Sequence, residues 1–278
     1  MKSRNPIPVF ACLSLMVILL GSCTGSNKLL MSSIPYAQSS YHVQPTLSDS
    51  ISHANYVSLA GSFNAIGRDL EDNSQLAQFK FHHAGTAGRF QYYGGLQLNA
   101  GAYNITDGLY EDSTFSEYPY RRSNFVFAGA VSFGAYYTLP VSKSFEWRIL
   151  GVDGSVGYEG GKYVQYRKGL PNHLLGYVDK ENFQQVYYLS TEMVFKKRRS
   201  GFKLGYQFSV GTTFRELPYD EYYNGSSSAV LNGYSTPAIV RNTLHLGNDP
   251  MYFYFQVYGS RYLLGFGTGI TYRISNLR

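Results

Sequence analysis

The chain has 278 residues, a length that suits one or two domains, and 44% of them are hydrophobic, which is enough for a core. Its formal net charge of +6 at pH 7 is small and the basic residues are scattered, which argues against a nucleic-acid-binding protein. Only 15% of residues are charged, whereas 27 Tyr, 18 Phe and 29 Gly dominate, so the apolar content is unusually aromatic.

The N-terminus has the parts of an export signal. Two basic residues in the first four positions precede an apolar segment over 7–20, followed by the small residues Gly21 and Ser22. Because this segment is too short to span a bilayer comfortably, it predicts a cleaved signal over residues 1–22. A plain secretory signal, or a buried helix that ends in Cys, is the alternative.

The end of this signal, Leu20-Gly21-Ser22-Cys23, resembles the lipobox of bacterial lipoproteins. The resemblance implies cleavage before Cys23, which then carries a diacylglyceryl thioether and an acylated amine. Since Cys12 lies in the removed part, the mature chain has no second cysteine for a disulfide or a thiolate metal site. No cofactor or metal is predicted beyond this covalent lipid, and residues 23–53 are expected to form a lipidated flexible tether.

From Tyr56 onward the chain alternates with a period of two, which is typical of β-strands. In the clearest segment, 202–214, large apolar residues alternate with small or polar ones. Ten strands are predicted, at Tyr56–Ala65, Leu76–Ala84, Phe90–Tyr103, Phe125–Leu139, Phe145–Tyr158, Phe183–Lys196, Phe202–Phe214, Ala238–Leu246, Met251–Tyr258 and Tyr262–Tyr272.

An apolar face with aromatic residues at both ends, opposite a small and polar face, is the signature of a transmembrane β-barrel. A soluble β-sandwich would also alternate, but it would fill a compact core mainly with Val, Leu and Ile. We therefore predict an all-β fold, an antiparallel up-and-down transmembrane β-barrel over residues 54–278, with ten strands and eight as the alternative. The apolar face switches sides within 145–158, which predicts a β-bulge near Ile149.

The connections between these strands alternate in length. Short ones fall near 86–89, 140–144 and 197–200, and long ones over 105–124, 160–182 and 216–236. In bacterial barrels the short turns face the periplasm and the long loops face outward. Both ends of the barrel are therefore expected in the periplasm.

At this point the chain is similar to the lipid-modified outer-membrane β-barrel proteins of Bacteroidota. The similarity rests on the lipobox, the tether with its Ser and Tyr residues, and the Tyr- and Gly-rich barrel. It implies an outer-membrane lipoprotein. Surface lipoproteins of that group usually have acidic residues just after the lipidated Cys, and 24–28 has none, so the anchor is expected in the periplasmic leaflet.

The sequence contains no clear catalytic pattern. The deacylase type of outer-membrane lipid hydrolase has Ser two positions after His, and no histidine here has that spacing. His82 and His83 point to opposite faces of a strand, so they cannot chelate one metal. A Ser-His-Asp triad assembled from distant positions stays possible.

Charged residues on the predicted inward face are expected to pair across a narrow lumen, because an unpaired buried charge is costly. Such a network would form a structural plug or, as the alternative, a gated conduction path. The residues are Lys80, Glu146, Arg148, Asp153, Glu192, Lys196, Lys203, Arg215 and Arg273.

The long loops combine flat aromatic and flexible polar residues, a composition typical of adaptable binding surfaces. The alternative is that they only pack over the barrel mouth. The candidate ligand-binding residues are Tyr110, Tyr118, Tyr120, Arg121, Arg122, Tyr219, Tyr222 and Tyr223.

These observations favour a non-enzymatic outer-membrane lipoprotein barrel that acts as a binding or accessory subunit. Its expected partners are outer-membrane lipid and other outer-membrane or periplasmic proteins, and no nucleic acid. A small channel is the alternative, and a lipid-modifying enzyme is a less favoured one.

Overall fold

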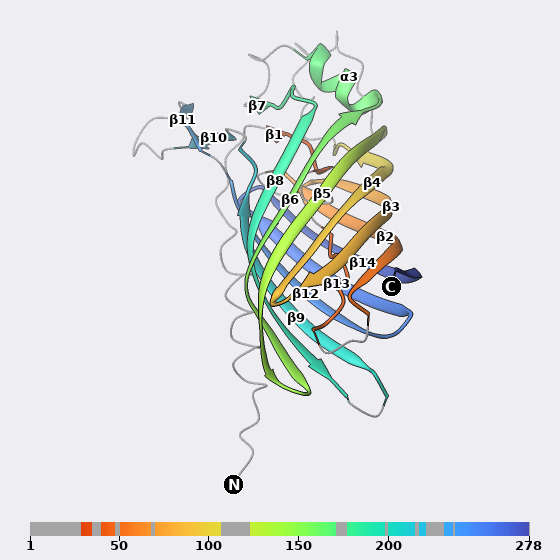
Figure 1. The fold of residues 1–278 in the computed structure, drawn as a ribbon. Coiled ribbons are helices and arrows are strands. Elements are labelled where there is room, and N and C mark those ends of the chain that lie inside the picture. The colour runs from red at the N-terminus through yellow and green to blue at the C-terminus, as the bar shows by residue number, and fades with distance from the viewer. Residues whose placement is uncertain are drawn as a thin grey trace.

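The computed structural model describes residues 29–34, 40–47, 51–67, 70–106, 123–170, 177–197, 200–214, 217–220, 231–235 and 237–277. Ten strands form a closed barrel (Figure 1). They are β2 (His53–Ile66), β3 (Asp72–Ala87), β4 (Phe90–Asn104), β5 (Ser123–Ser142), β6 (Phe145–Gly160), β8 (Phe183–Lys196), β9 (Lys203–Thr212), β12 (Ala238–Asn248), β13 (Met251–Ser260) and β14 (Leu263–Leu277).

Each barrel strand pairs antiparallel with the next one along the chain, and β14 pairs with β2 to close the wall. The prediction of an antiparallel barrel with ten strands is confirmed, and the alternative of eight strands is wrong. The turns β3–β4, β5–β6, β8–β9 and β12–β13 lie together at one end, which we call the turn end. The connections β4–β5, β6–β8 and β9–β12 lie at the opposite end, the loop end.

The loop end carries the short elements of the structure (Figure 1). In the β6–β8 connection, helix α3 (Lys162–Gly169) is followed by β7 (Tyr177–Val178), which pairs in parallel with β1 (Leu29–Leu30). In the β9–β12 connection, β10 (Leu217–Asp220) pairs antiparallel with β11 (Leu231–Ser235). Within the described residues, no helix has the length and apolar character needed to cross a membrane.

The strand pleat separates two environments on the wall. On β4, Leu96 and Leu98 are 62% and 61% exposed on the outside, whereas Gln97 between them is 1% exposed and faces the lumen. The same alternation on the other strands covers the outside with Leu, Phe, Val, Ile and Tyr. A closed barrel that exposes so large an apolar surface is stable only in contact with lipid. The barrel is therefore a transmembrane barrel.

A bulge in β6 confirms the predicted slip of the apolar face. The pairing of β6 with β8 shifts between Arg148 and Gly151, next to Ile149. Strict alternation would place Arg148 and Asp153, five positions apart, on opposite faces. Because the bulge adds one residue, both side chains face the lumen and both are buried.

Two described parts of the predicted tether are packed against the barrel and are not flexible, because residues 30–34 and 40–46 are buried. Residues 30–34 contact α3 and the β6–β8 connection at the loop end, and residues 40–46 contact inward-facing side chains of the barrel. The second of these parts therefore lies in the lumen. We call residues 29–34 the mouth segment and residues 40–47 the lumen segment.

Candidate functional site

The lumen is lined by polar and charged side chains together with many tyrosines and some small or aliphatic residues. Since the outward positions are taken by lipid-facing residues, every second residue of each strand faces inward, and the sequence places polar residues there. Two buried carboxylates, Asp153 and Glu192, are each the centre of an ionic cluster in this lining.

Glu192 on β8 forms the first cluster. One carboxylate oxygen lies 2.7 Å from Arg148 Nη1, and the other accepts from His245 Nε2 at 2.7 Å and from the Tyr41 hydroxyl at 2.9 Å. Gly205 makes room for the imidazole, because a Cβ there would lie 2.0 Å from His245 Nε2. The cluster joins three strands of the wall to the lumen segment.

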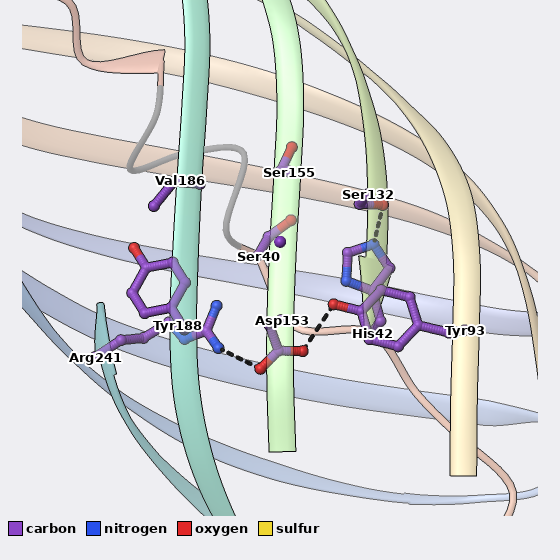
Figure 2. Close-up of a pocket in the computed structure, with 10 residues that line it drawn as sticks. Ser40, His42, Tyr93, Ser132, Asp153, Ser155, Val186, Tyr188 and Arg241 are labelled. Atoms are coloured by element: carbon purple, nitrogen blue, oxygen red, sulfur yellow. Dashed lines mark hydrogen bonds and ion pairs between the residues drawn. The ribbon is translucent and has the colours of Figure 1, made fainter. Parts of the chain in front are cut away.

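Asp153 on β6 forms the second cluster (Figure 2). It accepts hydrogen bonds from Tyr93 at 2.8 Å, from Ser190 at 2.6 Å and from the hydroxyl of Tyr136. Arg241 Nη2 lies 3.4 Å from its second oxygen. All of these partners belong to wall strands, so the pairing of this carboxylate does not depend on the lumen segment.

Wall side chains also satisfy the backbone of the lumen segment. The Tyr41 N–H donates to Gln256 Oε1 at 3.1 Å, and Lys80 Nζ donates to the Tyr41 carbonyl at 2.8 Å. His82 Nε2 lies 2.9 Å from the carbonyl oxygen of Val43. A peptide inside a closed barrel finds no free strand edge, so its buried N–H and C=O groups must bond to side chains.

Further along, the same kind of contact continues toward the turn end. The Leu47 N–H donates to Glu146 Oε2 at 3.0 Å, and Glu146 is the second residue of β6 after the β5–β6 turn. At the rim, the Ser52 carbonyl accepts from the Thr86 N–H at 2.8 Å, next to the β3–β4 turn. The lumen segment thus reaches the turn end, where β2 begins.

The mouth segment is held mainly by apolar packing. Leu30, Met31 and Ile34 belong to one buried cluster with Tyr103 and Tyr163. The Tyr163 hydroxyl donates to the Met31 carbonyl at 2.9 Å. Burial, with a smaller contribution from Tyr103, holds the pKa of the Tyr163 phenol well above its ordinary value, so it remains a donor.

An ion-pair cluster fixes the loop that covers the mouth segment. Arg167 of α3 lies 2.7 Å from Glu159 and 3.2 Å from Asp179, with all three side chains buried. The backbone N–H of Asp179 donates to the Leu30 carbonyl at 2.9 Å. The β6–β8 connection is therefore bonded both to the wall and to the mouth segment.

A Ser and a His do meet in the lumen. Ser132 Oγ and His42 Nε2 are 3.0 Å apart, and the His42 ring stacks on Tyr93 with centroids 4.3 Å apart (Figure 2). In the part of the chain that the structure describes, no bond joins His42 to a carboxylate. The cavity beside it measures about 10 Å³, roughly the space of one water. This geometry gives no room to an acyl chain and does not favour the lipid-modifying enzyme.

The predicted binding residues of the loops lie mostly outside the described residues. Tyr219 is in β10, where its backbone pairs with Gly233 of β11. The binding surface on these loops stays a prediction. The predicted lipidation residue Cys23 lies outside the described ranges. So do these predicted binding residues: Tyr110, Tyr118, Tyr120, Arg121, Arg122, Tyr222 and Tyr223.

The predicted inward charges are partly confirmed. Arg273 also faces inward, between the outward Tyr272 and Ile274, but it lies at the rim of the turn end, where it is partly buried and pairs with Asp249. Lys196 is half-buried at the same end, and Arg215 falls outside the described residues. Those confirmed as buried in the lumen are Lys80, Glu146, Arg148, Asp153, Glu192 and Lys203.

Sequence reasoning missed other members of the site. Arg241 and His245 alternate with Val240 and Leu244 in a segment that was predicted as a strand, so their inward direction could have been found. No comparable signal marks Tyr41, because 40–47 has no strand partner whose pattern would reveal its place.

The histidine pair follows the predicted geometry. His82 is fully buried in the lumen, whereas His83 is only partly buried and lies 2.9 Å from Asn55 Oδ1. The described residues contain no group of three His, Cys, Asp or Glu side chains arranged to hold a metal ion.

No protein-family model and no curated protein matches the chain. Solved structures match its overall shape. An outer membrane channel from Pseudomonas putida F1 has a TM-score of 0.42 at 8% identity, covering 84% of this chain and all of that one. The β domain of the Bordetella autotransporter BrkA has 0.40 at 12% identity, covering 80% and 99%. The Pseudomonas putida toluene transporter TodX has 0.31 at 10% identity, covering 91% and 74%. At such values the similarity carries no argument about activity.

Proposed function

We propose that this chain is an outer-membrane lipoprotein whose barrel is a small channel closed by its own N-terminal segment. One observation carries the proposal: a stretch of the same chain occupies a polar lumen and is bonded there by wall side chains. The segment is the closure, and the wall around it has the lining of a conducting path.

The two central carboxylates keep their ionic partners without the lumen segment, whereas Lys80 would lose the Tyr41 carbonyl and keep the Tyr254 hydroxyl. Glu192 loses the Tyr41 hydroxyl but retains Arg148 and His245, and the ionic partners of Asp153 are all on the wall. An open lumen would therefore not leave these carboxylates unpaired, which is the condition that makes buried charges costly.

The hydrogen bonds of the lumen segment can be exchanged for water. Each bond to a polar side chain has a net value of about 0.5–1.5 kcal/mol because water replaces the lost partner. Tyr41 and Val43 also pack in a buried, mostly aromatic cluster, and that packing is lost when the segment leaves. A packed apolar plug would have no such replacement. The polar lining thus supports a segment that can leave the lumen while the strands stay in place.

The lipoprotein and outer-membrane parts of the proposal have other support. The apolar band around a closed antiparallel barrel is typical of outer-membrane barrels. The lipobox sequence at 20–23 and the similarity to lipid-modified barrels of Bacteroidota support a lipid on Cys23. The proposed activity is passage of solutes through the lumen, without catalysis.

Planar-bilayer recording tests the channel. The complete mature chain should insert with few or no conductance steps, and a variant that lacks residues 29–47 should give stepwise, ohmic conductance. Heat-dependent migration in gels verifies that the deleted variant is folded. A folded variant that stays silent would contradict the channel and favour a barrel that serves only as a binding or accessory subunit.

Incorporation of labelled fatty acid tests the lipoprotein separately. The wild-type chain should be labelled and the Cys23→Ser variant should not. If the wild-type chain is not labelled, the lipoprotein part of the proposal is wrong. The channel part is then tested by the conductance recordings alone.

A further inference from the structure

The N-terminal segment enters the barrel at the loop end. Among the described residues, the partners of its upstream part, the mouth segment, lie at the loop end. Leu30 pairs with Val178 of β7, in the β6–β8 connection, and Ser33 Oγ accepts from Ser74 Oγ at 2.8 Å. Ser74 is the third residue of β3, close to where that strand leaves the loop end.

Downstream, the contacts move steadily toward the turn end. Tyr41 bonds to Gln256 and Glu192, in the middle parts of β13 and β8. Leu47 then reaches Glu146, beside the β5–β6 turn. The chain therefore passes through the whole barrel from the loop end to the turn end before it starts β2.

Leu29 and the two termini of the barrel thus lie at opposite ends of the barrel. β2 begins at His53 and β14 ends at Leu277, where the two residues pair at the turn end. The even number of strands alone would put all chain ends on that side. Because the segment before β2 lies inside the barrel, Leu29 is at the loop end.

Chain length then restricts where Cys23 can be. It precedes Leu29 by six residues, and six residues span at most about 22 Å when fully extended. The 14 residues of β2 at about 3.3 Å each cover about 46 Å, or about 35 Å along the axis at a tilt of about 40°. Cys23 cannot reach back from the loop end to the membrane surface at the turn end.

We propose that the acyl chains on Cys23 insert into the leaflet on the loop side, which is the outer leaflet of the outer membrane at the cell surface. This rests on the lipoprotein part of the proposed function. The partner of the N-terminus is then the outer-leaflet lipid, and the lipid holds the upstream end of the closing segment at the membrane surface.

This placement differs from the periplasmic leaflet expected from the sequence. That expectation used the absence of acidic residues in 24–28 and the side on which the barrel strands end. The strand ends do lie together at the turn end, but the lumen segment separates them from Cys23. A chain that crosses inside its own barrel reaches the loop side without any signal in 24–28.

Single-thiol variants of the full chain test the route. Because the only other cysteine is lost with the signal, the lipidated wild type has no free thiol and serves as the blank. Ser26→Cys reports the N-terminus, with Thr24→Cys as a second position. Lys168→Cys marks the loop end on α3, and Lys143→Cys marks the turn end in the β5–β6 turn; both lysines are exposed.

Cells are treated with a membrane-impermeant maleimide, intact or after the outer membrane is opened. Ser26→Cys and Thr24→Cys should be labelled in intact cells to the extent of Lys168→Cys, whereas Lys143→Cys should need opened cells. If the N-terminal thiols are labelled only together with Lys143→Cys, the proposed route is wrong. Fatty-acid labelling of the same cells reports the lipid independently, so failure of the lipoprotein and failure of the route give different results.

Discussion

The two faces of the barrel wall differ in how their contacts depend on geometry. Outside, Leu96 and Leu98 contact fluid lipid, and this contact is non-directional. Inside, Glu192 is held by Arg148, His245 and Tyr41 at fixed distances. The same strands therefore tolerate shape changes on one face and demand particular partners on the other. The effect of a substitution should depend on the face more than on the size of the change.

The largest effect is expected inside, for Glu192→Ala. The change leaves Arg148 and His245 buried without their carboxylate, which for a broken buried pair costs about 3–5 kcal/mol. The midpoint of unfolding in detergent and urea, followed by gel migration, should fall accordingly. Glu71→Ala is the control, because this exposed carboxylate should change stability by no more than about 0.5 kcal/mol. Equal midpoints for the two variants would mean that the cluster does not stabilise the wall.

A charge on the outer face should come next. Leu96 lies near the centre of β4, and Leu96→Arg places a guanidinium near the middle of the lipid band, at a cost of about 2–4 kcal/mol. The same unfolding assay in lipid vesicles measures it. Leu96→Phe keeps the position apolar and should be nearly neutral. A Leu96→Arg protein that is stably folded in solution without lipid vesicles would contradict the transmembrane orientation of this strand.

A methyl group at a crowded lumen position should have an intermediate effect. Gly205→Ala forces the His245 ring away from Glu192, and overpacking of this kind costs about 1–3 kcal/mol. Gly267→Ala is the control, because a Cβ there lies no closer than 3.4 Å to any neighbour. With His245→Ala added, the penalty of Gly205→Ala should largely vanish, since the clashing ring is gone. Additive penalties would show that the two residues do not interact.

The smallest change concerns the closure itself. Tyr41→Phe removes one hydrogen bond to the charged Glu192, worth about 1.5 kcal/mol at the lower end of the range for such bonds, from the lumen segment only. Spontaneous openings in bilayer recordings should become about ten times more frequent. Tyr258→Phe is the matched control, because it deletes a hydroxyl that bonds to Asn64 within the wall. If both variants open equally often, the Tyr41 contact has no part in closure.

The barrel wall could be predicted from the sequence because each strand alternates between residues that face lipid and residues that face the lumen. Alternation located all ten strands and even the bulge beside Ile149, and it placed Lys80, Arg148 and Asp153 inside. These are local patterns, in which a residue's neighbours in sequence reveal the side it faces.

The content of the lumen could not be predicted in this way. The segment around Tyr41 has no regular pattern, and its partners are up to 215 residues away. A Ser- and Tyr-containing stretch between a signal and a barrel has the composition of a tether. Only the arrangement of the inward donors and acceptors in three dimensions shows that it fits between them.

The bond from the Tyr41 N–H to Gln256, across 215 residues of chain, bears on the order of folding. Tyr41 precedes all ten barrel strands in the chain, whereas β13 is the ninth of them. Contacts between such distant parts of a chain form slowly, because a long loop must close before any bond repays its entropy. The bond between Tyr41 and Gln256 can therefore form only after β13 has been added to the barrel wall. A chain cut before β13 would lose the partner that holds its own beginning, along with the two strands that complete the ring.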